Sequence, residues 1–246
     1  MRRALLLLPF LVPAALPAQY PVKPHKAPSK DHRIEVPRRF EVGKPVDPNL
    51  ALKDLDGRLH RLGDLAGKTV VLHFWSTRCP WVKISDPKMV ALAETYAKNP
   101  KVVFLAVDSN RTELSPGPRS GRKTPGKTGA ARPYAELRET ARKRKLPFPV
   151  LVDPGNVVAD RFQALTTPHC YVIDPKGVLR YSGAFDDDMR GRKPLEEIRR
   201  YLKDAIDAVL AGRKVPVTKT RPYGCTIKRV RKPAPKKKGR VRRARG

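Results

Sequence analysis

Apolar residues along the chain gather in short runs that are separated by longer stretches of mixed polarity. Residues 70–75 form an apolar and aromatic run that only His73 interrupts, and residues 101–107 form a second such run. Runs of this length without a polar face are typical of strands buried on both faces of a sheet. Between them, apolar positions over residues 82–96 recur with the spacing of an amphipathic helix. A strand, a helix and a strand of these lengths predict a right-handed βαβ unit with a parallel sheet at its centre.

Shorter patterns on both sides of this unit predict the rest of the domain. Residues 50–55 and 59–62 alternate in polarity around Asp56-Gly57, which is a β-hairpin signal. Strands are also expected at 149–152, 169–173 and 178–181, and helices at 133–145, 157–162 and 195–210. Together these elements predict an α/β fold in which a mixed central sheet carries helices on both faces and an N-terminal β-hairpin.

The first residues have the pattern of a targeting signal. Arg2 and Arg3 precede an apolar run over residues 4–16 that is too short to span a bilayer comfortably. We therefore interpret residues 1–18 as a secretory signal peptide, with an uncleaved membrane anchor as the alternative. This interpretation predicts export to the periplasm or the extracellular space and a mature chain without a transmembrane segment. Residues 19–42, which are rich in Pro, Lys and Arg, are interpreted as an extended lead-in.

The charge of the chain is extreme and unevenly distributed. Lys and Arg number 53 against 23 Asp and Glu, which gives a net charge of +30, and the stretch from Gly212 onward holds fifteen of these cations and no acid. The folded domain is accordingly assigned to residues 43–212, with a basic insertion at 111–131 and a basic tail at 213–246. Non-specific contact of the tail with polyanions is one interpretation. A solvated tail without a partner is the other.

One cysteine occupies a position that favours reactivity. Cys79 follows the apolar strand at residues 70–75 and precedes Pro80, which suits the first position of a helix. Cys79 is therefore expected at the N-cap, where unpaired backbone amides and the nearby Arg78 favour a thiolate. A buried structural cysteine is the alternative. The stretch predicts a nucleophilic site of redox or acyl-transfer chemistry.

The stretch F-W-S-T-R-C-P-W-V at residues 74–82 resembles the active-site stretch of the thioredoxin superfamily. Trp75 and Cys79 match its strand aromatic residue and its attacking cysteine, whereas Val82 stands where the usual C-x-x-C motif has its second cysteine. The sequence is more similar still to redoxins related to the alkyl hydroperoxide reductase and thiol-specific antioxidant proteins, many of which carry a single cysteine in C-P-[YW]-V-K. This resemblance extends over roughly residues 43–210 and implies a thioredoxin-like fold.

The resemblance assigns roles to three further residues. The segment T-T-P-H-C-Y-V-I-D-P-K-G, which contains Pro168, is similar to the one in which thioredoxin-like proteins place a cis proline against the nucleophilic cysteine. His73 aligns with a buried acid of many thioredoxins and, as a neutral imidazole, could accept the proton of Cys79. A hydrogen-bonded core histidine is the alternative. Ser76 stands where peroxiredoxins hold the peroxide, but Leu72 replaces the proline of their motif.

The cysteine count leaves open how such a site is resolved. Export places Cys79, Cys170 and Cys225 where disulfides persist, and an odd count leaves one sulfur without an intramolecular partner. Cys170 follows Pro168 on a strand and is expected to be packed. Redoxins with C-P-[YW]-V often carry a segment similar to the G-C-T-I-K around Cys225, which implies that Cys225 resolves a mixed disulfide or sulfenic acid and forms a disulfide with Cys79 on oxidation. An unrelated third cysteine is the alternative.

Three other features are interpreted as parts of the surface. Residues 121–128 satisfy G-x-x-x-x-G-K-[ST], but no strand runs into the first glycine as a phosphate-binding loop requires, so the match is assigned to a solvated insertion. Three consecutive carboxylates at 186–188 cannot all face one ion and are interpreted as a solvated turn. His169 is expected to face solvent. Neither a metal nor a cofactor is expected.

The sequence therefore predicts an exported protein of thiol chemistry. The leading hypothesis is a thiol-disulfide oxidoreductase in which Cys79 attacks a protein or small-molecule disulfide, Pro168 shapes the substrate groove and an external thiol is the reductant. A thiol peroxidase that uses Cys79, with Ser76 nearby, on a peroxide is the second hypothesis. A non-catalytic redoxin scaffold, held to an anionic surface by the basic tail, is the third.

Overall fold

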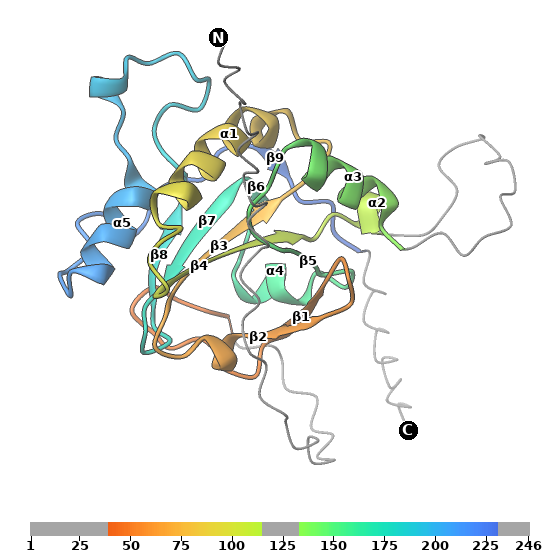
Figure 1. The fold of residues 1–246 in the computed structure, drawn as a ribbon, viewed down its shortest axis with the longest axis horizontal. Helices are drawn as coiled ribbons and strands as arrows, with labels where there is room; N and C mark the ends of the chain where they lie inside the picture. Colours follow the sequence, from red (N-terminus) through yellow and green to blue (C-terminus); the bar gives the residue numbers. More distant parts are fainter. Residues whose placement is uncertain (1–38, 115–132, 231–246) are drawn as a thin grey trace, which may run out of the picture.

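The computed structural model of the chain describes residues 39–114 and 133–230 (Figure 1). Five sequence predictions lie outside the described residues: the signal peptide, most of the lead-in, the phosphate-loop match, most of the basic insertion and the last part of the basic tail.

The described residues form nine strands and five α-helices. The strands are β1 Ala51–Asp54, β2 Leu59–Arg61, β3 Thr69–Trp75, β4 Val102–Asp108, β5 Val150–Val152, β6 Thr166–Thr167, β7 His169–Ile173, β8 Leu179–Gly183 and β9 Cys225–Thr226. The helices are α1 Pro80–Thr95, α2 Arg111–Leu114, α3 Ala135–Lys143, α4 Val157–Arg161 and α5 Tyr201–Leu210, with 3₁₀ turns at η1 Leu62–Leu65 and η2 Leu195–Glu197. Within the described ranges, no helix is long and apolar enough to cross a membrane.

Seven of the strands form one sheet in the order β2-β1-β5-β4-β3-β7-β8. β3 runs parallel to β4, and β4 runs parallel to β5, as the βαβ pattern predicted. β7 pairs antiparallel with both β3 and β8, and the hairpin of β1 and β2 joins the far edge through β5. The mixed sheet and its N-terminal β-hairpin are therefore confirmed.

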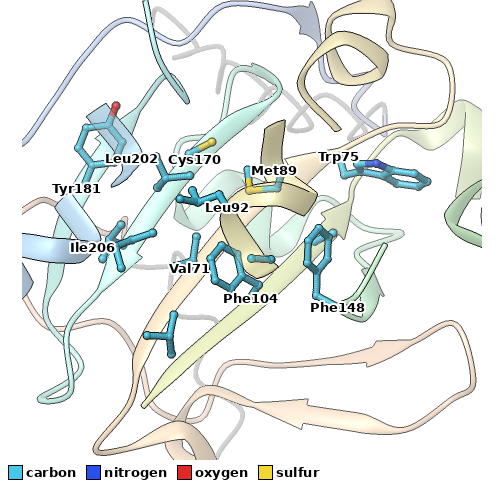
Figure 2. Packing of buried hydrophobic residues seen from close by; sticks show 14 of the residues in the cluster. Val71, Trp75, Met89, Leu92, Phe104, Phe148, Cys170, Tyr181, Leu202 and Ile206 are labelled. Carbon is cyan, nitrogen blue, oxygen red and sulfur yellow. The ribbon is translucent and has the colours of Figure 1, made fainter. Parts of the chain in front are cut away.

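The side chains of β3 divide the core into two layers. Val71 and Trp75 belong to the layer that also contains Met89 of α1 and Ile206 of α5 (Figure 2). Leu72, between them, belongs to the opposite layer, which α4 and the N-terminal segment cover. Successive side chains of a strand point to opposite faces, so this single strand fills both layers. Helices on both faces of the sheet are thus confirmed.

The closing helix is shorter than the predicted residues 195–210. α5 begins only at Tyr201, and the backbone between η2 and α5 is extended at Ile198. Arg199 explains the break, because its backbone N donates to Asp187 Oδ1 at 2.9 Å and its backbone O accepts from Asp187 N at 3.3 Å. A chain that pairs in this way with a neighbouring turn cannot continue the helical hydrogen-bond ladder.

Residues 215–230, called the C-terminal strap below, pack on the domain. Val215 and Ile227 are buried. Backbone hydrogen bonds join the strap to β8, and β9 pairs antiparallel with β6. Near its end, Lys228 N donates to Asn110 Oδ1 at 3.0 Å. The described part of the predicted basic tail therefore lies against the C-terminal ends of the central strands.

Candidate active site

Cys79 lies at the junction of β3 and α1. It is the N-cap of α1, and Pro80 holds the first helical position, as the sequence predicted. The side chain is only 2% exposed. Its Sγ caps no helix amide and instead donates a hydrogen bond to the backbone O of Thr167 at 2.9 Å. The sulfur therefore faces β6, a strand far away in the sequence.

A buried carboxylate holds the loop that leads to Cys79. Ser76 Oγ donates to Glu113 Oε1 at 2.5 Å, and the N and Oγ1 of Thr77 donate to Glu113 Oε2 at 2.7 and 2.5 Å. The hydroxyl of Ser76, the residue expected near a peroxide, is thus bonded within the loop. Sequence reasoning missed Glu113, although its place gave a signal: it follows β4, whose carboxyl end lies beside that of β3 in a parallel pair.

Asp108 forms a buried pair with Glu113 at the end of β4. Burial, the charge of Glu113 and a hydrogen bond to it raise the pKa of Asp108 well above its ordinary value. Asp108 Oδ1 also accepts from Asn110 N at 2.7 Å. Two carboxyl groups repel each other when both are ionised, which is the part of this pKa shift that Glu113 causes. The pair supports the loop of Ser76 and Thr77 from below.

The peptide bond between Thr167 and Pro168 is cis, as the sequence predicted. The Thr167 carbonyl accepts the hydrogen bond from Cys79, so Pro168 belongs to the segment that lines the sulfur. Thr166 Oγ1 lies 3.2 Å from the Pro168 carbonyl and 3.4 Å from the Tyr223 carbonyl, both of which accept hydrogen bonds from it. Direct contact between the proline ring and the sulfur stays a prediction.

Cys225 lies beside Cys79. Because β9 pairs with β6, Cys225 stands opposite Thr167, the residue whose carbonyl the Cys79 thiol contacts. Burial, followed by a hydrogen bond and a charge interaction with Cys79, raises the pKa of Cys225 to about 11. Both cysteines are free thiols. The pairing of β6 with β9 therefore brings Cys225 of the C-terminal strap opposite the residue that the Cys79 thiol contacts.

Gly224 allows the strap to come this close. Its φ of +135° is a backbone conformation that residues with a side chain rarely adopt. A Cβ at this position would lie 2.0 Å from the Thr167 carbonyl oxygen, far inside the contact distance of the two atoms. The glycine of the G-C-T-I-K segment is thus a steric requirement for the pairing of Cys225 with β6.

His73 is buried in the middle of β3. Its ring packs edge-on against Phe148, with ring centroids 5.3 Å apart. Neither ring nitrogen has a hydrogen-bond partner in the described part of the chain, so the alternative of a hydrogen-bonded core histidine is wrong. Burial lowers the pKa of His73 to about 3. The imidazole is therefore neutral at physiological pH and is a weak proton acceptor.

Cys170 and His169 are both buried on β7. Cys170 is completely buried, as predicted, and this burial raises the pKa of its thiol. The expectation that His169 faces solvent is wrong, because β7 is an interior strand paired on both sides. His169 Nδ1 accepts a hydrogen bond from Leu165 N at 3.3 Å and lies 3.0 Å from the Tyr171 hydroxyl.

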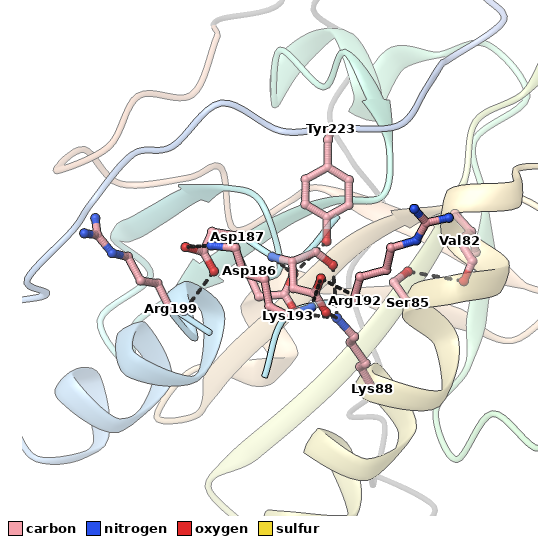
Figure 3. Close-up of polar contacts among 10 residues, drawn as sticks. Val82, Ser85, Lys88, Asp186, Asp187, Arg192, Lys193, Arg199 and Tyr223 are labelled. Atoms are coloured by element: carbon pink, nitrogen blue, oxygen red, sulfur yellow. Dashed lines mark hydrogen bonds and ion pairs between the residues drawn. The ribbon is translucent and has the colours of Figure 1, made fainter. Parts of the chain in front are cut away.

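The carboxylates at 186–188 are not a solvated turn, contrary to the sequence interpretation. Asp186 and Asp188 are 3% and 4% exposed, and each accepts a hydrogen bond from Lys88 Nζ at 2.9 Å (Figure 3). A lysine from α1 thus neutralises two acids at the turn, which no local sequence pattern could reveal. In the described ranges, no cluster of three or more His, Cys, Asp or Glu side chains could hold a metal ion.

Comparison with known proteins places the chain in a family. Residues 42–182 match the model of the AhpC/TSA family. The chain is 25% identical over 167 residues to the thiol-disulfide oxidoreductase ResA of Bacillus thuringiensis subsp. konkukian (strain 97-27), a match that covers 67% of this chain and 79% of the relative. It is 30% identical over 133 residues to the thioredoxin-like protein YneN of Bacillus subtilis (strain 168), which covers 54% of this chain and 66% of YneN.

Solved structures show the same fold. An uncharacterized conserved protein from Geobacillus kaustophilus has a TM-score of 0.61 and 30% identity, covering 77% of this chain and 92% of its own. A hypothetical protein from Sinorhizobium meliloti 1021 also has a TM-score of 0.61, with 25% identity, covering 78% of this chain and 97% of its own.

Proposed function

The chain belongs to the AhpC/TSA family and has a thioredoxin-like fold, and we propose that it is a thiol-disulfide oxidoreductase with Cys79 as nucleophile and Cys225 as resolving cysteine. The observation that carries this proposal is the strand pairing that sets Cys225 opposite Thr167, whose carbonyl accepts the hydrogen bond from the Cys79 thiol. The ResA relative is named for this activity, and its match extends over 79% of its length. Cys225 then replaces the second cysteine of the C-x-x-C motif, where this chain has Val82.

The proposed cycle consists of two thiol-disulfide exchanges. The thiolate of Cys79 attacks one sulfur of a substrate disulfide, the substrate S–S bond breaks, and the other substrate sulfur leaves as a thiolate that takes up a proton. The thiolate of Cys225 then attacks the Cys79 sulfur, which releases the second substrate thiol and leaves a Cys79–Cys225 disulfide. An external thiol reductant supplies two electrons and restores both thiols.

The residues around the sulfur atoms are assigned supporting roles. The Thr167 carbonyl and the adjoining Pro168 fix the strand against which Cys225 is presented. Ser76 belongs to the loop that Glu113 anchors, and its hydroxyl is already bonded there. His73 is given no part in proton transfer, because burial lowers its pKa to about 3. Export through residues 1–18, and polyanion contact through the basic tail, remain part of the proposal.

The test is a parallel measurement of disulfide exchange and peroxide reduction on the full chain. The expected result is fast exchange with a disulfide substrate and slow reaction of Cys79 with peroxide, both lost in Cys79→Ser. Fast formation of a sulfenic acid at Cys79, with slow disulfide exchange, supports the thiol peroxidase instead. Absence of both reactions supports the non-catalytic scaffold. Cys170→Ala is the control, because this thiol is completely buried on β7.

A further inference from the structure

The pairing that brings Cys225 to Cys79 is short. β6 and β9 have two residues each, and Thr167 and Cys225 are directly opposite. On the C-terminal side of Cys225 the strap is held as well, because Ile227 N donates to the Leu165 carbonyl at 3.1 Å. A pairing of two residues frays readily on a side where nothing else holds it. An attachment on the N-terminal side of Cys225 would therefore decide how much of the time its sulfur stays beside Cys79.

Such an attachment is present two residues before Cys225. The Tyr223 hydroxyl donates to Asp186 Oδ1 at 3.0 Å, and Asp186 lies 3% exposed beyond the end of β8 (Figure 3). The other oxygen of the same carboxylate, Oδ2, accepts from Lys88 Nζ at 2.9 Å. One buried carboxylate therefore joins the C-terminal strap to helix α1.

The helix at the other end of this connection is the one that begins at Cys79. Lys88 lies within α1, so the connection ties the strap to the same rigid element that carries the nucleophile. Lys88 is itself held by Asp188, through Oδ2 at 2.9 Å and the backbone O at 3.1 Å. Hydrogen bonds to an ionised carboxylate are stronger than those between neutral groups, so the Tyr223 contact is a firm one.

We propose that Lys88, Asp186 and Tyr223 form a tether that positions Cys225 for attack on the mixed disulfide at Cys79. The inference rests on the proposed function, because it concerns the second exchange of that cycle. Lys88, Asp186 and Tyr223 act as positioning residues: none of them takes part in bond making, and each acts by holding the strap against α1. Loss of the tether lowers the effective concentration of Cys225 at Cys79 and leaves the first attack intact.

Tyr223→Phe isolates the tether with little other damage. The substitution removes the hydroxyl but keeps the ring, and Asp186 Oδ1 retains the hydrogen bond from Asp188 N at 3.0 Å. The ion pair with Lys88 is untouched, so no buried charge is left unpaired. Tyr96→Phe is the matched control, because the Tyr96 hydroxyl donates to Asp207 Oδ1 at 2.5 Å between the end of α1 and α5, away from the strap.

The experiment mixes the reduced full chain with an aromatic disulfide whose released thiolate is coloured. The first phase of colour reports the attack by Cys79, and the second phase reports resolution by Cys225, because each exchange releases one thiolate. We expect Tyr223→Phe to slow the second phase by about fivefold or more relative to the first, and Tyr96→Phe to change neither phase. A general loss of stability would move both phases together and would not alter their ratio.

Two results separate failure of the tether from failure of the proposed function. If Cys225→Ser abolishes the second phase but Tyr223→Phe leaves it at the wild-type rate, the tether is refuted and the proposed function stands. If the wild type has no second phase, or Cys225→Ser keeps it, the proposed function fails and the tether fails with it. If the second phase depends on Cys225 and is slowed in Tyr223→Phe but not in Tyr96→Phe, the result supports both the tether and the proposed function.

Discussion

Cys79 and Cys170 are two cysteines with almost the same burial and quite different surroundings. Cys79 is 2% exposed and Cys170 is completely buried. Cys170 lies on β7 between its partners His73 on β3 and Gly183 on β8, and burial raises the pKa of its thiol. Cys79 lies at a helix start, where its thiol donates to the Thr167 carbonyl, and Cys225 stands opposite Thr167. Under the proposed function, burial alone therefore does not separate the nucleophilic cysteine from the structural one.

The difference lies in what covers each sulfur. Cys170 is covered by the hydrogen-bonded ladder of the sheet and by the apolar layer under α1 and α5 (Figure 2), which cannot open without local unfolding. Cys79 is covered by the C-terminal strap, whose strand β9 has two residues and whose Cys225 is only partly buried. The proposed function requires this part of the strap to move aside for a substrate and to return with the Cys225 thiol, while other bonds, such as Lys228 N to Asn110 Oδ1 at 3.0 Å, hold the rest of the strap.

The largest expected effect compares the two cysteines directly. Cys79→Ser should lower turnover of a disulfide substrate on the order of 10³-fold or more, since a serine hydroxyl is a poor nucleophile toward sulfur at neutral pH. Cys170→Ala should leave turnover unchanged and lower the free energy of unfolding by about 1 kcal/mol, the order expected for removing one small buried group. Steady-state turnover and denaturant unfolding measure the two effects. Equal turnover in both variants would contradict the assignment.

The second prediction concerns whether Cys225, in the strap that covers Cys79, resolves the mixed disulfide. Cys225→Ser should retain the first exchange and accumulate a mixed disulfide with the substrate at Cys79, because no second thiol can release it. Mass spectrometry of the quenched reaction detects this adduct. Added small thiol should restore part of the turnover. Failure to trap any adduct, with turnover at the wild-type level, would show that an external thiol resolves Cys79.

A third test displaces β9 of the C-terminal strap and keeps the Cys225 sulfur. Gly224→Ala places a Cβ against the Thr167 carbonyl, whereas at Gly57, which also has a positive φ, a Cβ would meet nothing within 4 Å. Gly57→Ala therefore carries a similar backbone strain, about 1 kcal/mol, without the clash. We expect Gly224→Ala to slow the second exchange about tenfold, since a displacement that costs about 1.4 kcal/mol lowers the paired population by that factor. If the second exchange is equally fast in Gly224→Ala and Gly57→Ala, the pairing of β9 with β6 is not needed for resolution by Cys225.

The smallest effect concerns the neighbour of Cys170. The pKa of His73 is about 3 in the folded protein, below its ordinary value near 6.5, so between these pH values the unfolded chain binds the extra proton. The contribution of His73 to the free energy of unfolding is therefore fully present above pH ~6.5. As the pH falls below this value, the free energy of unfolding decreases by up to ~1.4 kcal/mol per pH unit.

The variant that tests this pH dependence is His73→Leu. It should lose about 2 kcal/mol less stability than the wild type on going from pH 7 to pH 5. The buried His169, whose pKa is also lowered to about 3, remains in both proteins and cancels in the comparison. Denaturant unfolding at both pH values measures the effect. Parallel pH profiles would show that His73 is not buried as a neutral base.

The parts of the molecule that could be predicted from the sequence are those with strong local patterns. The continuous apolar run of β3 and the Cys79-Pro80 pair predicted the central strand, the start of α1 and the place of Cys79 at that start, whereas the role of Cys79 as nucleophile stays a proposal. The segment around Pro168 gave the cis peptide bond through a family resemblance. These features depend on residues that are neighbours in the sequence, so a single chain reveals them.

The parts that could not be predicted depend on single contacts between distant segments. The sequence alone indicates that Asp186 is a surface acid, because its two partners, Lys88 of α1 and Tyr223 of the strap, are far from it along the chain. Glu113 has no local motif and is defined by the loop of Ser76 that it holds. The strap lacks a periodic apolar pattern, and its order depends on backbone pairing with β6 and β8 and on the close approach that Gly224 allows.

The most direct test of the account is a mass map of the disulfide in the oxidised full chain. We expect one intramolecular disulfide that joins Cys79 to Cys225, with Cys170 recovered as a free thiol under denaturing alkylation. Cys225 already stands opposite Thr167, whose carbonyl the Cys79 thiol contacts, and a disulfide needs Cα atoms within about 7 Å of each other. A disulfide from Cys79 to Cys170, or an oxidised protein in which Cys225 stays free, would contradict the central claim.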